Sequence, residues 1–251
     1  MKKAVVLFSG GQDSTTCLFW ALKKFGTGNV IAIGFDYGQK HKVELEQAKK
    51  IAELVSVDYR VFSTEGLLGG SSLTEHGDTN EPHKVNSNLP SSFTAGRNML
   101  FLTIAAQFAY EEGIRDIVTG VCQTDYSGYP DCRRNFINSM EVSLGLAMDT
   151  DFRIYTPLMY LTKAGTWGLA NELSDLHQKD SWDLKAYKIE GVLEDKGSIY
   201  FNTVKIIRDL TLTDYNGDNQ TMNEWGLGKE DNPASILRAK GFREAKELGL
   251  I

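Results

Sequence analysis

The sequence has few cysteines and no long hydrophobic run. Its 251 residues include three cysteines, Cys17, Cys122 and Cys132, which lie far apart and form no CxxC pair. This spacing excludes a disulfide framework and any zinc site recognisable from sequence, and it is typical of a reducing compartment. No apolar run approaches the length of a membrane span, and the first residues enter an expected strand rather than a signal peptide. We therefore expect a cytoplasmic protein without a membrane partner.

Positive charge is also scarce. The formal net charge is -6 at pH 7, which argues against a broad nucleic-acid-binding surface. We expect a small-molecule substrate and no nucleic-acid partner.

Apolar, β-branched segments recur at intervals long enough for a crossover helix. This alternation predicts an α/β fold with an open, mostly parallel sheet and helices on both faces. The expected strands are residues 4–8, 29–36, 58–62, 114–120 and 152–157. The expected helices are residues 14–22, 43–54, 98–112, 134–146 and 162–173, with Asn98 and Thr162 as N-caps.

The pattern weakens after Leu173. Strands are expected at residues 186–193 and 198–204, and a final helix at residues 234–248. We predict an α/β domain that binds ATP and substrate over residues 1–173, followed by a small irregular C-terminal appendage over residues 174–251.

Two adjacent glycines follow the first expected strand, in the segment Ser9-Gly10-Gly11-Gln12-Asp13-Ser14. A glycine turn between a strand and a helix places main-chain N–H groups at the positive end of the helix, where they bind phosphate. The segment has neither the lysine of a Walker loop nor the GxGxxG pattern of dinucleotide-binding proteins. It therefore predicts a nucleotide phosphate site.

The carboxylate of Asp13 would repel a phosphate unless a cation lay between them. A Mg²⁺ ion shared by Asp13 and the phosphate oxygens removes this conflict. We therefore expect Mg²⁺ as a cofactor alongside the nucleotide.

Further polar residues follow the carboxyl ends of other expected strands, where open α/β sheets bind ligands. Asp36 and Gln39 follow the second strand, and Arg97 precedes a helix, where it either binds an anion or is an ordinary surface arginine. Lys163 begins another helix and can neutralise departing pyrophosphate, or is a solvated helix residue. The loop over residues 66–92 is long enough to be a candidate lid.

The loop over residues 120–133 is the densest polar and aromatic segment of the chain. Asp125 and Asp131 can accept hydrogen bonds from a heterocycle, Tyr129 can stack on its ring, and Arg133 can bind a carboxylate. Cys132 is either a nucleophile or, as we favour, a packing or substrate-contact residue, because no histidine is close in sequence.

These motifs together resemble a known family. LFSGGQDSTTCL, FDYGQKH, AGRN, TGVCQTDYSGYPDCR and TPLMYLTKA stand in the order found in the 7-cyano-7-deazaguanine synthases (QueC), over residues 3–173. That family belongs to the PP-loop ATP pyrophosphatases, whose fold is like that of the adenine nucleotide alpha hydrolases. The resemblance implies ATP-dependent conversion of 7-carboxy-7-deazaguanine and ammonia into the nitrile preQ0, through an adenylated carboxylate and an amide, in queuosine-type deazapurine biosynthesis.

The resemblance also implies roles for individual residues. It extends the ATP site to Phe8 and Thr15, places Asp125, Tyr129, Asp131 and Arg133 near the deazaguanine, and places Lys163 near the pyrophosphate. On this basis the expected catalytic residues are Asp13, Lys163 and Arg133. The resemblance further suggests a homodimer.

The C-terminal third departs from the family pattern of four zinc-binding cysteines. Asp214, Lys229, Asn232 and Ser235 occupy the four ligand positions, and lysine and asparagine are poor zinc ligands. We therefore expect no zinc. Instead we expect residues 174–209, together with hydrogen bonding such as that of Asp214 to Lys229, to replace the metal.

This departure leaves three functions open. The first, which the intact motifs favour, is a nitrile synthase that folds without zinc. The second is a diverged adenylating ligase that stops at the amide or acts on another carboxylate. The third is a non-catalytic nucleotide-binding homologue.

Overall fold

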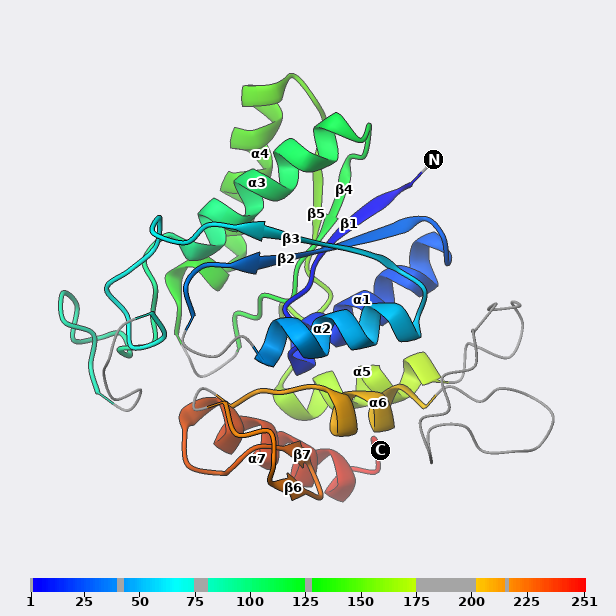
Figure 1. Cartoon of the computed structure of the whole chain (residues 1–251), viewed down its shortest axis with the longest axis vertical. Helices are drawn as coiled ribbons and strands as arrows, with labels where there is room; N and C mark the ends of the chain where they lie inside the picture. Colours follow the sequence, from blue (N-terminus) through cyan, green and yellow to red (C-terminus); the bar gives the residue numbers. More distant parts are fainter. Residues whose placement is uncertain (1, 40–42, 75–80, 125–127, 175–201, 215–216) are drawn as a thin grey trace.

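A five-stranded parallel sheet in the order β3-β2-β1-β4-β5 forms the centre of the molecule, with helices on both faces (Figure 1). The computed structural model describes residues 2–39, 43–74, 81–124, 128–174, 202–214 and 217–251. The strands of the sheet are β1 (Ala4–Leu7), β2 (Val30–Asp36), β3 (Asp58–Ser63), β4 (Asp116–Val118) and β5 (Arg153–Tyr155). The helices around it are α1 (Gln12–Phe25), α2 (Val43–Leu54), α3 (Arg97–Glu111), α4 (Arg134–Met148) and α5 (Lys163–Ser174). The expected fold and order of elements are confirmed, with boundaries that differ by a few residues.

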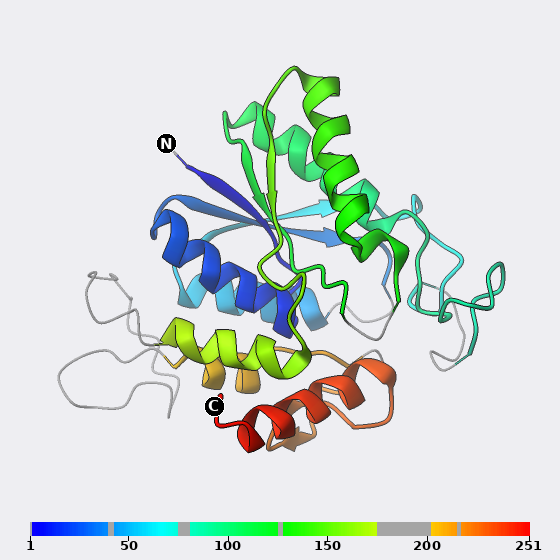
Figure 2. The ribbon, with the colours of Figure 1, turned by 180° about the vertical axis from the view of Figure 1, so that it is seen from behind.

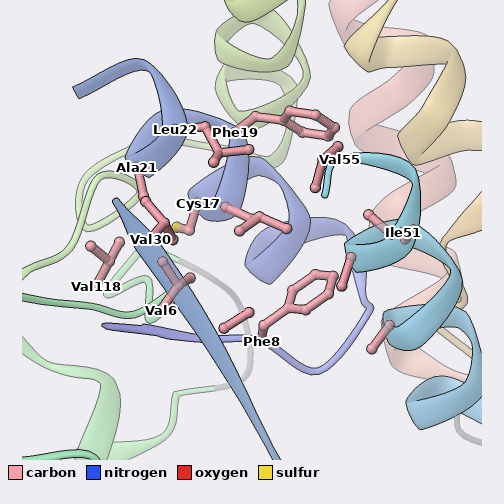
Figure 3. Close-up of a cluster of buried hydrophobic side chains, with 14 of the residues drawn as sticks. Val6, Phe8, Cys17, Phe19, Ala21, Leu22, Val30, Ile51, Val55 and Val118 are labelled. Carbon is pink, nitrogen blue, oxygen red and sulfur yellow. The ribbon is translucent and has the colours of Figure 1, made fainter. Parts of the chain in front are cut away.

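Alternating residues of the central strands pack against different helices, because successive side chains of a strand point to opposite faces. Val6 lies in a buried cluster with Phe8, Cys17 and Ile51, and so packs against α1 and α2 (Figure 3). Its neighbour Val5 lies in a second cluster formed largely by α3 and α4. The central strands β1 and β2 therefore have no polar face, as expected for strands of a parallel sheet that are covered on both sides.

The C-terminal residues form a further layer against α1, on the side away from the sheet (Figure 2). It contains α6 (Thr203–Leu210), the two-stranded hairpin β6 (Met222–Asn223) and β7 (Gly226–Leu227), and α7 (Pro233–Glu247). Trp167 of α5, Trp225 and Phe242 of α7 form its buried apolar cluster. Large aromatic side chains allow this small layer to bury a core of its own.

The structure corrects one expected strand in this layer. Thr203 and Val204 begin α6 rather than ending a strand at residues 198–204, and the side chain of Asn202 caps the helix by accepting a hydrogen bond from Lys205 N at 2.8 Å. The rest of that expected strand through residue 201, and the one at residues 186–193, lie outside the described residues.

The loops that follow β1, β2 and β4 leave the same edge of the sheet, because these strands are parallel. The strand order reverses at β1, which has β2 on one side and β4 on the other. Open α/β sheets bind ligands at such a reversal, outside the carboxyl ends of the strands. In the part of the chain that the structure describes, no helix is both long and apolar enough to cross a membrane.

Candidate active site

The glycine turn after β1 is packed tightly against α2. Gly10 has φ +84°, and a Cβ there would lie 2.6 Å from the carbonyl oxygen of Glu44, so a side chain fits neither the conformation nor the space. Ser14 closes the turn, since its hydroxyl donates to Gly11 O at 3.1 Å and accepts from Ser9 N at 3.2 Å. The turn therefore holds the N-terminus of α1 in a fixed position.

A cavity of about 1100 Å³ opens at this edge of the sheet. Eleven of the predicted site residues line it: Phe8, Ser9, Gly11, Gln12, Asp13, Ser14, Gln39, Arg97, Tyr129, Cys132 and Lys163. The volume is at the upper end of small-molecule sites, so the cavity has room for a nucleotide together with a bicyclic substrate.

Other predicted residues lie beside this cavity rather than on its wall. Thr15 is fully buried in α1, and its N–H donates to Gly11 O at 3.0 Å. Asp36 accepts a hydrogen bond from Gly38 N at 3.3 Å, within the turn after β2. Gln39, which does line the cavity, closes the same turn by accepting from Tyr37 N at 2.9 Å.

Lys163 and Asp13 form an ion pair inside the cavity. The Lys163 Nζ lies 2.7 Å from Asp13 Oδ2 and 3.0 Å from Oδ1. The ammonium side chain is 9% exposed and the carboxylate 28% exposed. The start of α5 thus brings a cation to the N-terminus of α1, 150 residues away in the chain.

Arg97 lies at the start of α3, with its guanidinium 5.8 Å from the centre of the Tyr37 ring. The hydrogen bond of Arg97 and its positive charge favour the ionised form of Tyr37, but burial outweighs them and raises the pKa of that hydroxyl. Arg97 therefore brings a second positive charge to the wall of the cavity, from a different part of the chain than Lys163.

The structure corrects the expected N-cap of α3. The cap residue is Gly96, and Asn98 lies inside the first turn, where its N–H donates to Asp131 Oδ2 at 3.1 Å. Asn98 also donates through its side chain to Asp131 O at 3.3 Å and to Cys132 Sγ at 3.4 Å. Asp131 is buried, and its carboxylate supplies the cap that sequence proximity assigned to Asn98.

Tyr129 joins the loop after β4 to the candidate lid. Its hydroxyl lies 2.7 Å from Ser92 Oγ, and its ring centre is 5.7 Å from that of Phe93. Leu73, Glu81, Asn88 and Pro90 of the same long segment line the cavity. The described residues of this segment therefore form part of the cavity wall next to Tyr129, which is a position suited to a lid.

Arg133 is exposed and lines a smaller neighbouring cavity of about 440 Å³. Gly128, Tyr129 and Cys122 line both cavities. Arg133 is therefore separated from Lys163 and Asp13 by the wall around Tyr129. Asp125 lies outside the described residues.

Glu44 is a cavity residue that sequence reasoning missed. It lies in the first turn of α2, and desolvation raises its pKa to about 7, although the charge of Arg97 acts in the opposite direction. The sequence predicted only a helix over residues 43–54, because nothing in sequence shows that α2 packs on the glycine turn.

The C-terminal layer also contributes to the cavity, which sequence reasoning did not anticipate. Leu212, Thr213, Asp214, Ile236 and Lys240 all line it. The Oγ1 atom of Thr213 accepts a hydrogen bond from Gln12 N at 3.4 Å. The glycine turn after β1 and the C-terminal layer therefore line one cavity.

The four residues at the positions of the family's zinc-binding cysteines form a hydrogen-bonded cluster. Asp214 accepts from Lys229 N at 2.9 Å through Oδ2 and from Asn232 Nδ2 at 2.8 Å through Oδ1. Asn232 caps α7 by accepting from Ser235 N at 3.1 Å, and Ser235 Oγ accepts in return from Asn232 N at 3.4 Å. The predicted contact of Asp214 with Lys229 is present, but it involves the main-chain N–H, since the ammonium lies 3.4 Å from Asp218.

This cluster does not have the chemistry of a zinc site. Its one carboxylate already accepts a hydrogen bond through each oxygen, and its other side chains are a lysine, an amide and a hydroxyl. Among the residues that the structure describes, no group of three His, Cys, Asp or Glu side chains is placed to hold a metal ion.

The parallel sheet and the SGGQDS turn at the start of α1 have the arrangement expected of a PP-loop ATP pyrophosphatase. The chain belongs to the QueC family, since the family described as "Queuosine biosynthesis protein QueC" matches residues 3–246.

Curated relatives support this assignment. The chain is 56% identical over 243 residues to the 7-cyano-7-deazaguanine synthase of Bacteroides fragilis (strain YCH46), covering 96% of this chain and 94% of the relative. It is 43% identical over 252 residues to that of Clostridium novyi (strain NT), covering 98% and 96%. Among solved structures, the NH3-dependent NAD synthetase from Campylobacter jejuni subsp. jejuni NCTC 11168 has a TM-score of 0.43 at 15% identity, over 70% of this chain and 65% of that chain.

Proposed function

We propose that this chain uses ATP to convert 7-carboxy-7-deazaguanine and ammonia into 7-cyano-7-deazaguanine. The observation that carries the proposal is the 1100 Å³ cavity, in which the SGGQDS turn, the Lys163–Asp13 pair and Tyr129 lie together. Relatives at 43–56% identity that are named for this reaction match the whole length of the site.

ATP binds with its phosphates at the N-terminus of α1. The main-chain N–H groups of the SGGQDS turn and the helix dipole attract the anion. Asp13 is the residue that would hold Mg²⁺, because its carboxylate is an oxygen ligand on the cavity wall beside this turn. When bound, Mg²⁺ supplies positive charge that neutralises the phosphate oxygens.

Lys163 stabilises the negative charge that develops on pyrophosphate as the carboxylate is adenylated. Its ammonium is little exposed, so its field on a nearby phosphate is weakly screened. Asp13 keeps Lys163 oriented before ATP arrives, through the two hydrogen bonds described above. Arg97 supplies a second cation on the cavity wall.

Tyr129, Cys132 and the loop that carries them form the side of the site for the deazaguanine. The ring of Tyr129 offers a flat surface for the bicyclic substrate, and its hydroxyl bond to Ser92 fixes the ring's position. Asp131 acts through Asn98, since it holds the start of α3 and so orients Arg97. We retain Asp125 and Arg133 as substrate residues on the family resemblance.

We further propose that the protein folds without zinc. The hydrogen bonds among Asp214, Lys229, Asn232 and Ser235 support this proposal, because they join the positions that a metal would otherwise link. The family resemblance also leads us to propose that the protein is a homodimer and that its substrate is a free small molecule. Light scattering after size-exclusion chromatography tests the dimer.

The function is tested by mass spectrometry of the products formed from 7-carboxy-7-deazaguanine, Mg-ATP and ammonium chloride. The proposal predicts the nitrile, with AMP and pyrophosphate. Accumulation of the amide alone would replace it with an amide-forming ligase. The absence of any product together with retained ATP binding would indicate a non-catalytic nucleotide-binding protein.

A further inference from the structure

Arg238 of α7 is a fully buried arginine in the C-terminal layer. Its guanidinium donates to the carbonyl oxygens of Ile207 at 2.9 Å, Thr211 at 3.1 Å and Trp225 at 3.2 Å. It also lies 5.7 Å from the centre of the Trp167 ring. Burial lowers its pKa to about 9, although the charge of Asp13 acts in the opposite direction. The side chain is thus fixed by several bonds, and it remains charged at neutral pH.

One further bond connects Arg238 to the phosphate turn. Its Nη1 donates to Thr213 Oγ1 at 3.0 Å, and the same oxygen accepts from Gln12 N at 3.4 Å. A hydroxyl group has two acceptor lone pairs and one proton to donate. Because both lone pairs of Thr213 face donors, its proton is directed elsewhere.

Thr213 lines the cavity together with Gly11, Gln12 and Lys163, so an acceptor bound there can receive this proton. A hydroxyl that accepts from a cation is polarised and becomes a stronger donor. The most negative group expected in the cavity is the polyphosphate of ATP at the start of α1. The hydroxyl of Thr213 is placed next to that position.

Helix α7 also contacts Lys163 directly. A Cβ on Gly241 would lie 2.5 Å from Lys163 Cβ, so the glycine is what allows α7 to approach the start of α5. Arg238 and Gly241 are three residues apart and therefore lie on the same side of the helix. One face of α7 thus contacts both Lys163 and, through Thr213, the phosphate turn.

We infer that Thr213 is a phosphate-binding residue, which donates its hydroxyl proton to the polyphosphate of ATP, and that Arg238 is the residue that positions it. This inference rests on the proposed function only in requiring that the cavity bind ATP. It assigns to the C-terminal layer a direct part in nucleotide binding.

The test compares Thr213→Val with Thr213→Ser in the full-length protein, by calorimetric titration with Mg-ATP and with adenosine. Valine keeps the shape of threonine and lacks the hydroxyl, so we expect ATP affinity to fall by about tenfold or more, the usual effect of losing a hydrogen bond to a charged group. Adenosine affinity should not change. Serine should restore ATP affinity, and Arg238→Gln should lower it if that variant folds.

Unchanged ATP affinity in Thr213→Val would overturn the inference, as would an equal loss of ATP and adenosine affinity, which would indicate general distortion of the site. Thermal unfolding without ligand, measured for both variants, identifies such distortion. Failure of the wild-type protein to bind ATP would instead reject the proposed function. The two failures are therefore distinguishable.

Discussion

Asp214 accepts a hydrogen bond from Asn232 Nδ2 at 2.8 Å, in a buried position where the family pattern has two thiolates. Asp214 is 2% exposed and Asn232 is 0% exposed. A buried carboxylate is stable only when donors surround it, and the main-chain N–H of Lys229 supplies the second one. The bond joins the segment after α6 to the start of α7, which is the connection that a metal would make.

The substitution Asp214→Ala is expected to destabilise the protein. It removes the acceptor of the partly buried Lys229 N–H and one of two acceptors of the Asn232 amide, which also donates to Asp231 Oδ1 at 3.2 Å. Because a buried donor that loses its acceptor costs about 1–3 kcal/mol, we expect the free energy of unfolding in urea to fall by roughly 1–3 kcal/mol. The matched control is Glu224→Ala, which removes a half-exposed carboxylate paired with Arg243 and Lys246 and should cost less than about 1 kcal/mol.

The same cluster predicts that a chelator has no effect on stability. Urea unfolding of the wild-type protein should be the same with and without a zinc chelator, and metal analysis should find less than one zinc per chain. A lower unfolding midpoint in the presence of the chelator would contradict a zinc-free fold.

Lys163→Met is expected to lower the rate of pyrophosphate release by roughly 10²–10³-fold, the usual effect of losing one electrostatic contact in the transition state. Methionine keeps most of the aliphatic stem that packs against Gly241. Lys240→Met is the control, since that lysine lines the same cavity but its side chain is 68% exposed. An equal loss of rate in both variants would show that only the net charge of the cavity matters.

Tyr129 and Ser92 are expected to act together in binding the deazaguanine. Removing either hydroxyl, by Tyr129→Phe or Ser92→Ala, breaks the same 2.7 Å hydrogen bond between the loop after β4 and the candidate lid. Both variants should raise the KM for 7-carboxy-7-deazaguanine and leave the KM for ATP unchanged. In a double-mutant cycle, the coupling free energy between the two substitutions should be about 1 kcal/mol. Additive effects on KM would contradict a joint role of the two residues in substrate binding.

Glu44 is expected to make the protein less stable as the pH rises from about 4.5 to 7. Its pKa is raised from 4.5 to about 7 in the folded state, so over this range the folded protein binds more protons than the unfolded chain. The free energy of unfolding therefore falls as the pH rises. Glu44→Gln should be more stable than wild type at pH 8, on the order of 2 kcal/mol, and equally stable at pH 4.

Other charged and titratable groups lie near Glu44: Arg97 of α3, Tyr37 after β2 and Tyr59 of β3, with Asp13 and Lys163 across the cavity. Glu46→Gln is the control, because that residue is on the same helix turn but exposed. A stability difference between Glu44→Gln and wild type that is the same at pH 4 and pH 8 would contradict the raised pKa.

Local pattern was sufficient to predict the sheet and its helices. Strands β1 and β2 are continuous apolar runs, and the glycine turn between β1 and α1 is one contiguous motif, so their signals lie within a few residues of each other. The parallel arrangement then follows, because each strand is separated from the next by a segment long enough for a crossover helix. The position of the candidate nucleotide site, at the end of β1, could be predicted for the same reason.

The errors arose where a residue's partner is distant in sequence. Asn98 looks like a helix cap from its neighbours alone, yet the cap comes from Asp131, 33 residues later. Residues 203–204 looked like a strand end because Val204 is apolar, and the packing of α6 against α1 and α5 decided otherwise.

The sequence by itself determined the glycine turn after β1 and the absence of thiolates at Asp214, Lys229, Asn232 and Ser235, and it predicted Lys163 as a cation for that turn. Only the tertiary structure decided that these last residues bond to one another and that Thr213 and Glu44 share the cavity with the turn. The physical reason is that a turn is specified by the conformations of adjacent residues. A hydrogen bond such as that between Gln12 and Thr213 depends instead on how α1 and the C-terminal layer pack across 201 residues of chain.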